Sequence, residues 1–135
     1  MRLVILEDSR RERQAAIAAA EAAGYTVVAT SETYHGSLSA TFGRSDYDGI
    51  LTDLTMPDPN SSKREFTELG YQVVAEALEI GKPVVVCSGM RESYPEDLEP
   101  MVLFSRLVAW VSGYGSDTDL KKWPEAVAAF DELSR

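Results

Sequence analysis

The segment LVILEDS, residues 3–9, passes from four apolar residues directly into two acidic ones. An apolar run of this length that ends abruptly in charge is typical of a strand buried on both faces, so we expect a strand over residues 2–7. A helix is expected to follow at once. Ser9 and Glu12 have capping-box spacing, and an alanine-rich stretch leads from them to Gly24, which supplies the C-terminal stop.

The same alternation of strand and helix patterns continues along the chain. Further strands are expected at residues 25–30, 47–54, 83–87 and 108–112, and further helices at residues 31–42, 62–80, 95–107 and 124–134. Five strand–helix alternations predict an α/β fold, a doubly wound five-stranded parallel sheet with helices on both faces. The flavodoxin-like strand order 2-1-3-4-5 is the expected one. Residues 113–123 give no clear pattern.

Length and composition narrow the class of protein. A chain of 135 residues fits one domain, residues 1–135, and 13 basic against 22 acidic residues give a net charge of −9, which disfavours direct nucleic-acid binding. The longest apolar runs are strand-length and far short of the ~20 residues of a membrane span. The N-terminus carries no signal-peptide pattern, and a single cysteine, Cys87, fits a reducing compartment. We therefore expect a cytoplasmic protein without membrane insertion.

Three carboxylates are predicted to meet at one edge of the sheet. Glu7 and Asp8 close the first strand, and Asp53 lies near the end of the third in GILTDLTMP, residues 49–57. Ligands of open parallel sheets bind beyond the carboxyl ends of the strands, and the first and third strands are neighbours in this topology, so the acids are expected close together. Clustered carboxylates repel one another unless a cation neutralises them, and ligation by oxygen atoms alone suits Mg²⁺. The sequence therefore predicts a Mg²⁺ site.

Asp53 is the predicted nucleophile of this site. Its carboxylate lies between a strand and a proline-bounded loop, which fixes its direction and leaves one side open to a phosphodonor. Ser88, just past the fourth strand, has a hydroxyl that can donate to a phosphoryl oxygen. Together these groups predict a pocket of phosphate size.

Three segments in this order resemble the receiver domains of two-component response regulators. LVILEDS (residues 3–9) resembles the family's first strand with its acidic pair, and TDLTMPD (residues 52–58) resembles the phosphoacceptor segment. PVVVCSG (residues 83–89) is similar to the fourth strand with its Ser or Thr switch residue, here Ser88. The resemblance spans residues 1 to about 110.

The resemblance implies a signalling role. Asp53 would accept a phosphoryl group from the histidine of a sensor histidine kinase or a phosphotransfer protein. Mg²⁺ would be held by Asp8, Asp53 and the carbonyl of Thr55, with Glu7 assisting indirectly or through water. We expect a stand-alone receiver that signals to a downstream target protein by contact, with catalysis limited to its own phosphorylation and the hydrolysis of its phosphoryl group.

One part of the family pattern is broken. Receiver domains carry an aromatic residue on the fifth strand and, three positions later, a lysine that pairs with the phosphoryl group. Trp110 fits the aromatic, although core packing explains a tryptophan there as well. Gly113 stands at the lysine position, and the nearest lysines are Lys121 and Lys122. The pattern favours a pocket without lysine, in which phosphorylation couples only weakly to the face of the fourth helix, fifth strand and fifth helix. The alternative is that Lys121 or Lys122 folds back into the pocket, which the glycine and short polar residues of YGSDTDL, residues 114–120, permit but do not require.

Two alternatives remain open at this point. The first is a pseudo-receiver, a binding module of the same fold that is not phosphorylated, and Gly113 at the lysine position favours it. The second is a Mg²⁺-dependent phosphatase with an aspartyl nucleophile. That class needs a second acid two residues after the nucleophile, where this chain has Thr55.

Overall fold

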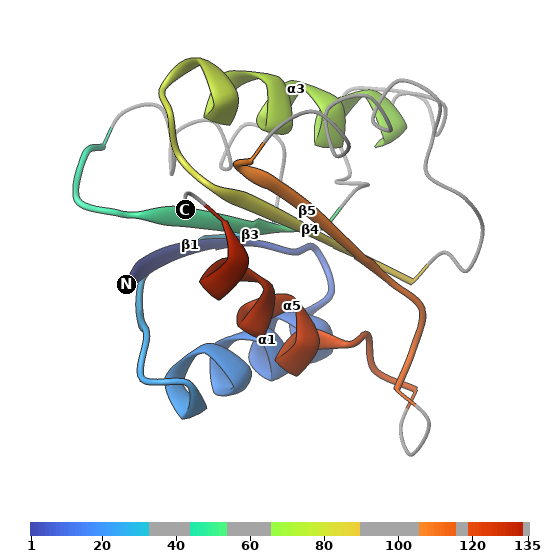
Figure 1. Cartoon of the computed structure of the whole chain (residues 1–135). Helices are drawn as coiled ribbons and strands as arrows, with labels where there is room; N and C mark the ends of the chain where they lie inside the picture. Colours follow the sequence, from blue (N-terminus) through green and yellow to red (C-terminus); the bar gives the residue numbers. More distant parts are fainter. Residues whose placement is uncertain (33–43, 54–65, 90–105, 116–118, 134–135) are drawn as a thin grey trace.

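A computed structural model describes residues 1–32, 44–53, 66–89, 106–115 and 119–133 of the chain (Figure 1). Within them, all-parallel strand pairs form a five-stranded sheet in the order β2-β1-β3-β4-β5, which confirms the predicted fold class. The strands are β1 (Arg2–Leu6), β2 (Thr26–Ser31), β3 (Gly49–Thr52), β4 (Val84–Ser88) and β5 (Val108–Ser112).

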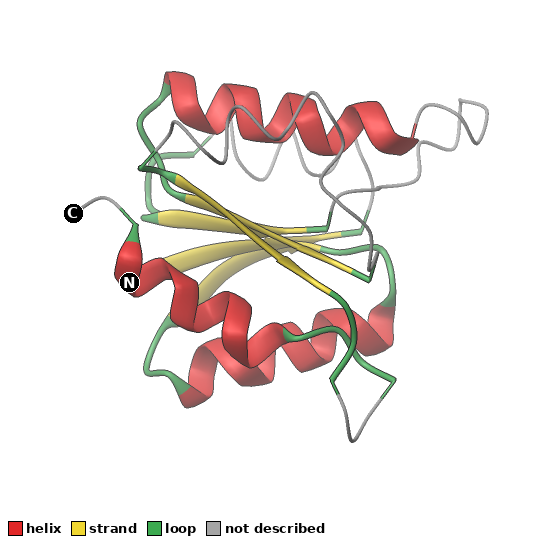
Figure 2. Cartoon of the chain, turned by 45° about the vertical axis from the view of Figure 1, so that its right-hand side comes forward, coloured by secondary structure: helices red, strands yellow, loops and turns green. Residues whose placement is uncertain are grey.

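Helices cover both faces of the sheet. They are α1 (Arg10–Ala22), α3 (Phe66–Glu79) and α5 (Trp123–Ala129), the last followed by a short 3-10 turn, η2 (Phe130–Glu132). Figure 2 shows α3 on one face and α1 with α5 on the other. None of the helices in the described part of the chain combines the length and apolar character that a bilayer span requires.

The core forms two layers because β1 is buried on both faces. Val4 and Leu6 belong to the layer beneath α3, whereas Leu3 and Ile5 belong to the layer beneath α1 and α5. Successive side chains of a strand point to opposite faces, so a run of four apolar residues fills both layers. This explains why the first strand is continuously apolar and why its charged residues begin only at its carboxyl end.

Local signals set the ends of α1. The hydroxyl of Ser9 accepts a hydrogen bond from the backbone N–H of Glu12 at 3.4 Å, as the predicted N-cap requires. Past the other end of the helix, Gly24 adopts a φ of 85°, a left-handed conformation that favours glycine. The chain can therefore turn sharply from α1 into β2.

Parts of the remaining helix predictions lie outside the described residues. Residues 62–65, the predicted start of the helix over 62–80, are among these, and so are residues 33–42 of the helix predicted over 31–42. Ser31 is described and is the last residue of β2, so the prediction of a helix that begins there is wrong. In the predicted helix over 95–107, only residues 106 and 107 are described. They form a turn, so that prediction is wrong at its C-terminal end.

Candidate functional site

Three acids meet beyond the carboxyl ends of β1 and β3. Glu7, Asp8 and Asp53 each place a carboxylate oxygen within 4.8 Å of the others. The sheet ladder continues past the strands, since the N–H of Asp53 donates to the carbonyl of Leu6 at 2.8 Å and that of Glu7 to the carbonyl of Ser31 at 3.0 Å. The predicted cluster is therefore present, on a backbone held by the sheet. Glu7 and Asp53 are buried, and Asp8 is exposed.

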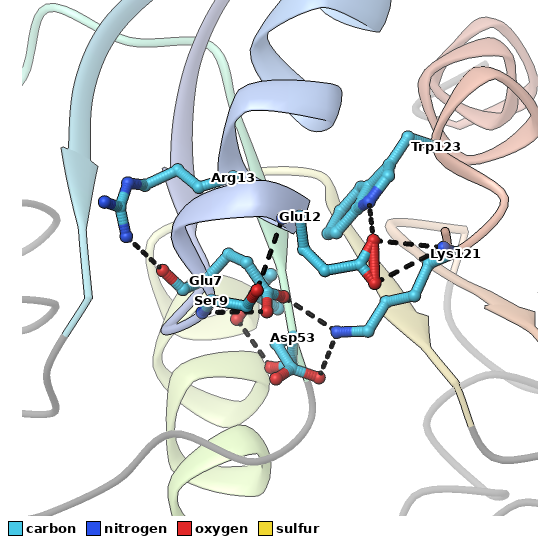
Figure 3. Close-up of polar contacts among 8 residues, drawn as sticks. Glu7, Ser9, Glu12, Arg13, Asp53, Lys121 and Trp123 are labelled. Atoms are coloured by element: carbon cyan, nitrogen blue, oxygen red, sulfur yellow. Dashed lines mark hydrogen bonds and ion pairs between the residues drawn. The ribbon is translucent and has the colours of Figure 1, made fainter. Parts of the chain in front are cut away.

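Lys121 lies between the two buried acids. Its ammonium Nζ is 2.8 Å from Glu7 Oε2 and 3.0 Å from Asp53 Oδ1 (Figure 3). The expectation of a pocket without lysine is therefore wrong. Weak coupling of phosphorylation to the face of the fourth helix, fifth strand and fifth helix was expected because the pocket was thought to lack a lysine. That reason no longer holds, since Lys121, in the segment that leads into α5, contacts Asp53.

A short return of the chain carries Lys121 to this place. Gly113 has a φ of 92° and donates its N–H to the carbonyl of Ser88 at 2.9 Å, so the chain leaves β5 in a turn that favours glycine. Tyr114 then forms an antiparallel bridge with Lys121, and the N–H of Gly115 donates to the carbonyl of Leu120 at 2.9 Å. Residues 113–115 and 119–121, the described parts of the segment without a clear sequence pattern, form a hairpin-like return, which brings Lys121 to the pocket in place of a lysine at position 113.

The pocket holds more buried negative charge than Lys121 can neutralise. Two buried carboxylates share one ammonium, and burial followed by the charge of Asp53 raises the pKa of Glu7 to about 8, although Lys121 opposes this. Burial by itself would lower the pKa of Lys121, but Asp53 and Glu7 together hold it above its ordinary value. Lys121 is therefore charged at neutral pH, and of the two acids it is Glu7 whose protonated form is favoured, by burial and by the charge of Asp53.

The remaining walls of the pocket come from the end of β4 and from the return. The cavity has a volume of about 500 Å³, and Ser88, Gly89 and Tyr114 line it beside the acids and Lys121. Ser88 is buried, as a hydroxyl at the floor of a pocket would be. At Gly89 a Cβ atom would come within 2.6 Å of the Tyr114 ring, so the close approach of Tyr114 to β4 requires a glycine there.

Of the comparisons with known proteins, the one with solved structures found similar proteins. No protein-family model matches the sequence, and no curated protein does. The receiver domain of RcsB from Salmonella enterica serovar Typhimurium, determined with the phosphomimetic BeF3⁻, is 19% identical, with a TM-score of 0.67 over 97% of this chain and 88% of that chain. The receiver domain of the response regulator NarL from Mycobacterium tuberculosis is 19% identical, with a TM-score of 0.65 over 99% and 97%.

A third match broadens the range of organisms. The N-terminal domain of a response regulator/sensory box/GGDEF protein from Carboxydothermus hydrogenoformans is 19% identical, with a TM-score of 0.64 over 97% of each chain. This chain has the receiver-domain fold. Identities of this size concern the fold alone, so the chemistry of the pocket has to be argued from its own residues.

In this receiver fold, the acids form a donor set that suits a hard divalent cation. Their oxygens are close enough together to share one ion, and oxygen ligands are those that Mg²⁺ prefers. Both carboxylate oxygens of Glu7 are already engaged, Oε1 by the N–H of Ser9 at 3.3 Å and Oε2 by Lys121. Asp8 and Asp53 are therefore the better candidates for direct ligands, and Glu7 for an indirect one. Thr55, the predicted carbonyl ligand, lies outside the described residues.

Trp110 contributes to packing in this structure. It is partly buried against the apolar layer beneath α3, and it pairs with Val86 in the sheet. Cys87 is buried in β4, where desolvation raises the pKa of its thiol to about 12, so it fits the small buried side chain expected from an apolar strand.

Sequence reasoning missed two features of this receiver fold. Tyr114 was not recognised as a wall of the pocket, and Glu12 was assigned to a capping box although its carboxylate reaches the Lys121 backbone. The glycines at 113 and 115, with short polar residues before Lys121, are a hairpin signal that points to the return. Nothing in the sequence indicates where such a return docks.

Proposed function

We propose that this protein is a receiver module of two-component signalling that accepts a phosphoryl group on Asp53. The contact between Lys121 and Asp53 carries the proposal. A buried lysine beside a carboxylate at the open end of a parallel sheet provides both a nucleophile and a cation for the charge that arrives with a phosphoryl group.

The proposed step is the transfer of a phosphoryl group from the donor to Asp53. A carboxylate oxygen of Asp53 attacks phosphorus, and the bond from phosphorus to the leaving group breaks with its electron pair, which gives an acyl phosphate. Lys121 lies beside Asp53, where it would pair with a phosphoryl oxygen, and Ser88 lines the same pocket, where its hydroxyl would donate to another. Mg²⁺ held by Asp8 and Asp53, with Glu7 behind them, would neutralise phosphoryl charge. Water later attacks phosphorus, the bond from phosphorus to the Asp53 oxygen breaks with its electron pair, and inorganic phosphate leaves, which restores the carboxylate.

The partners follow from this chemistry. The donor is the phosphohistidine of a sensor kinase or a phosphotransfer protein, and the output is contact with a downstream target in the cytoplasm. The net charge of −9 argues against direct nucleic-acid binding. The matched structures include DNA complexes of RcsB, and this chain spans 98% of one such RcsB chain and 63% of another at 18% and 19% identity, so DNA binding there is a property of RcsB. The pseudo-receiver alternative rested on the absent lysine, and Lys121 removes that reason.

Intact mass after incubation with a small phosphodonor and Mg²⁺ tests the proposal. We expect wild type to gain the mass of one phosphoryl group and Asp53→Asn to gain none, because an amide oxygen is a far weaker nucleophile. Asp131→Asn is the matched control, since that exposed acid contacts Tyr25 away from the pocket and should leave phosphorylation intact. Wild type that stays unmodified would support the pseudo-receiver instead, and label on Asp53→Asn would place the acceptor elsewhere.

Mg²⁺ is expected to stabilise the fold through the acid cluster. A ligand that binds only the folded state at about 100 times its Kd adds about 2.7 kcal/mol, which is several degrees of Tm in a domain of this size. Thermal unfolding of wild type with saturating Mg²⁺ against a chelator measures the shift, and Asp8→Ala, which removes an exposed ligand with little effect on packing, is expected to lose most of it. An equal shift in both proteins would show that the site lies elsewhere.

A further inference from the structure

We propose that Glu12 is a positioning residue, which holds the Lys121 backbone so that its ammonium reaches Asp53. Glu12 belongs to the first turn of α1. The geometry stands by itself, whereas the effect on phosphoryl binding rests on the proposed function.

One oxygen of Glu12 receives two hydrogen bonds from the segment that carries Lys121. The N–H of Lys121 donates to Glu12 Oε1 at 3.1 Å, with a longer contact of 3.4 Å to Oε2, and the indole Nε1–H of Trp123 donates to Oε1 at 3.0 Å (Figure 3). These donors lie on either side of Lys122, where the return becomes α5. The carboxylate therefore fixes the backbone from which the Lys121 side chain starts.

Glu12 can bind the Lys121 backbone because Glu7 makes the capping-box hydrogen bond that was predicted for Glu12. In a capping box its carboxylate would accept from the N–H of Ser9. Here that N–H donates to Glu7 Oε1 at 3.3 Å, so Glu7 completes the first turn of α1 and Glu12 turns toward the return. Lys121 is therefore held at two points, its ammonium by Glu7 and its backbone N–H by Glu12.

The two strands of the return are anchored on different elements. The outgoing strand is tied to β4 where Gly113 donates to the carbonyl of Ser88, and the bridge between Tyr114 and Lys121 joins the strands to each other. On the incoming strand, Glu12 accepts hydrogen bonds from Lys121 and Trp123, and both of these residues are buried. The ion pair of Arg11 with Asp119 also bridges α1 and the return, but it is exposed and contributes little.

Glu12→Gln and Glu12→Ala separate the hydrogen bonds from the charge. Both variants remove the negative charge from the first turn of α1, so both lose its interaction with the helix dipole. Glutamine retains a carbonyl oxygen that can replace Oε1 and accept from both donors, whereas alanine retains nothing. A positioning role therefore predicts rescue by glutamine, which a charge effect does not.

The structural arm uses the metal-free protein and two-dimensional ¹H–¹⁵N NMR. The chain has two tryptophans, so Trp110→Phe assigns the indole signal of Trp123. We expect Glu12→Ala to shift that signal and speed hydrogen exchange of the Lys121 amide, and Glu12→Gln to stay near wild type. Glu21→Ala, an exposed acid on the same helix, is the control and should change neither. Unchanged signals in Glu12→Ala would overturn the positioning geometry.

The functional arm measures half-saturation by beryllofluoride with Mg²⁺ in a double-mutant cycle. We expect Glu12→Ala to weaken binding about tenfold, the effect of losing about two hydrogen bonds, and Glu12→Gln about twofold or less. In a Lys121→Ala background, Glu12→Ala should add nothing, because it acts through that lysine. Equal effects in both backgrounds, or tight binding by Glu12→Ala, would overturn the inference alone. Wild type that fails to bind beryllofluoride would overturn the proposed function and the role of Glu12 together.

Discussion

Replacing Lys121 by alanine is expected to weaken the binding of a phosphoryl mimic strongly, though measurably, and to destabilise the metal-free fold. The Lys121 ammonium contacts both buried acids, and without it Glu7 and Asp53 lose the cation that they share. Breaking a buried ion pair by removing one partner costs about 3–5 kcal/mol, and we expect the lower end because Glu7 can take up a proton. Protonation of Glu7 becomes less favourable as the pH rises, so the loss of unfolding free energy is expected to be larger at pH ~9 than at pH ~6.

Urea unfolding with a chelator at these two pH values measures the loss, and Lys122→Ala is the matched control. Lys122 is the adjacent lysine, is only half-buried, and caps α5 without a side-chain hydrogen bond. Its replacement is expected to cost less than about 1 kcal/mol and to leave the binding of a phosphoryl mimic intact. If the two lysines behaved alike, the assignment of Lys121 to the pocket would be contradicted.

Replacing Glu7 by glutamine is expected to stabilise the metal-free protein above neutral pH. The pKa of Glu7 is raised in the folded state, so its contribution is fully present below the unfolded value of about 4.5 and is lost as the pH rises to about 8. Within that window the stability of wild type falls by at most about 1.4 kcal/mol per pH unit from this group. Glutamine carries no charge to desolvate and leaves Lys121 to Asp53, so we expect a gain of roughly 1–3 kcal/mol at pH ~9.

The difference between the two proteins as a function of pH checks this expectation. Every other titrating group is present in both, so the difference in unfolding free energy with a chelator isolates Glu7. It should grow from pH ~5 to pH ~8 and then level off. A constant difference would mean that Glu7 is ionised throughout, held in that state by Lys121.

Much of the fold was predictable because the apolar pattern of each strand reflects which of its faces are buried. The run from Leu3 to Leu6 fills two core layers, so its pattern shows a strand covered on both faces, and the acids after it mark the edge of the sheet. Position in a parallel sheet then brings Asp53 to the same edge as Glu7. The cluster therefore followed from topology alone.

The lysine was not predictable because its placement depends on contacts between segments distant in sequence. Gly113 stands where the family pattern has a lysine, and the docking of the return on Glu12 brings Lys121 to Asp53 instead. The spacing of Ser9 and Glu12 predicted a capping box, which holds for the Ser9 hydroxyl but not for the Glu12 carboxylate. A polar side chain with more than one partner within reach cannot be assigned from local spacing.

A crystal structure with beryllofluoride and Mg²⁺ tests the central claim most directly. The account predicts beryllium bonded to a carboxylate oxygen of Asp53, with the Lys121 ammonium and the Ser88 hydroxyl each within hydrogen-bonding distance of a fluorine. Beryllofluoride bound away from Asp53, or bound to Asp53 while Lys121 points out of the pocket, would contradict it.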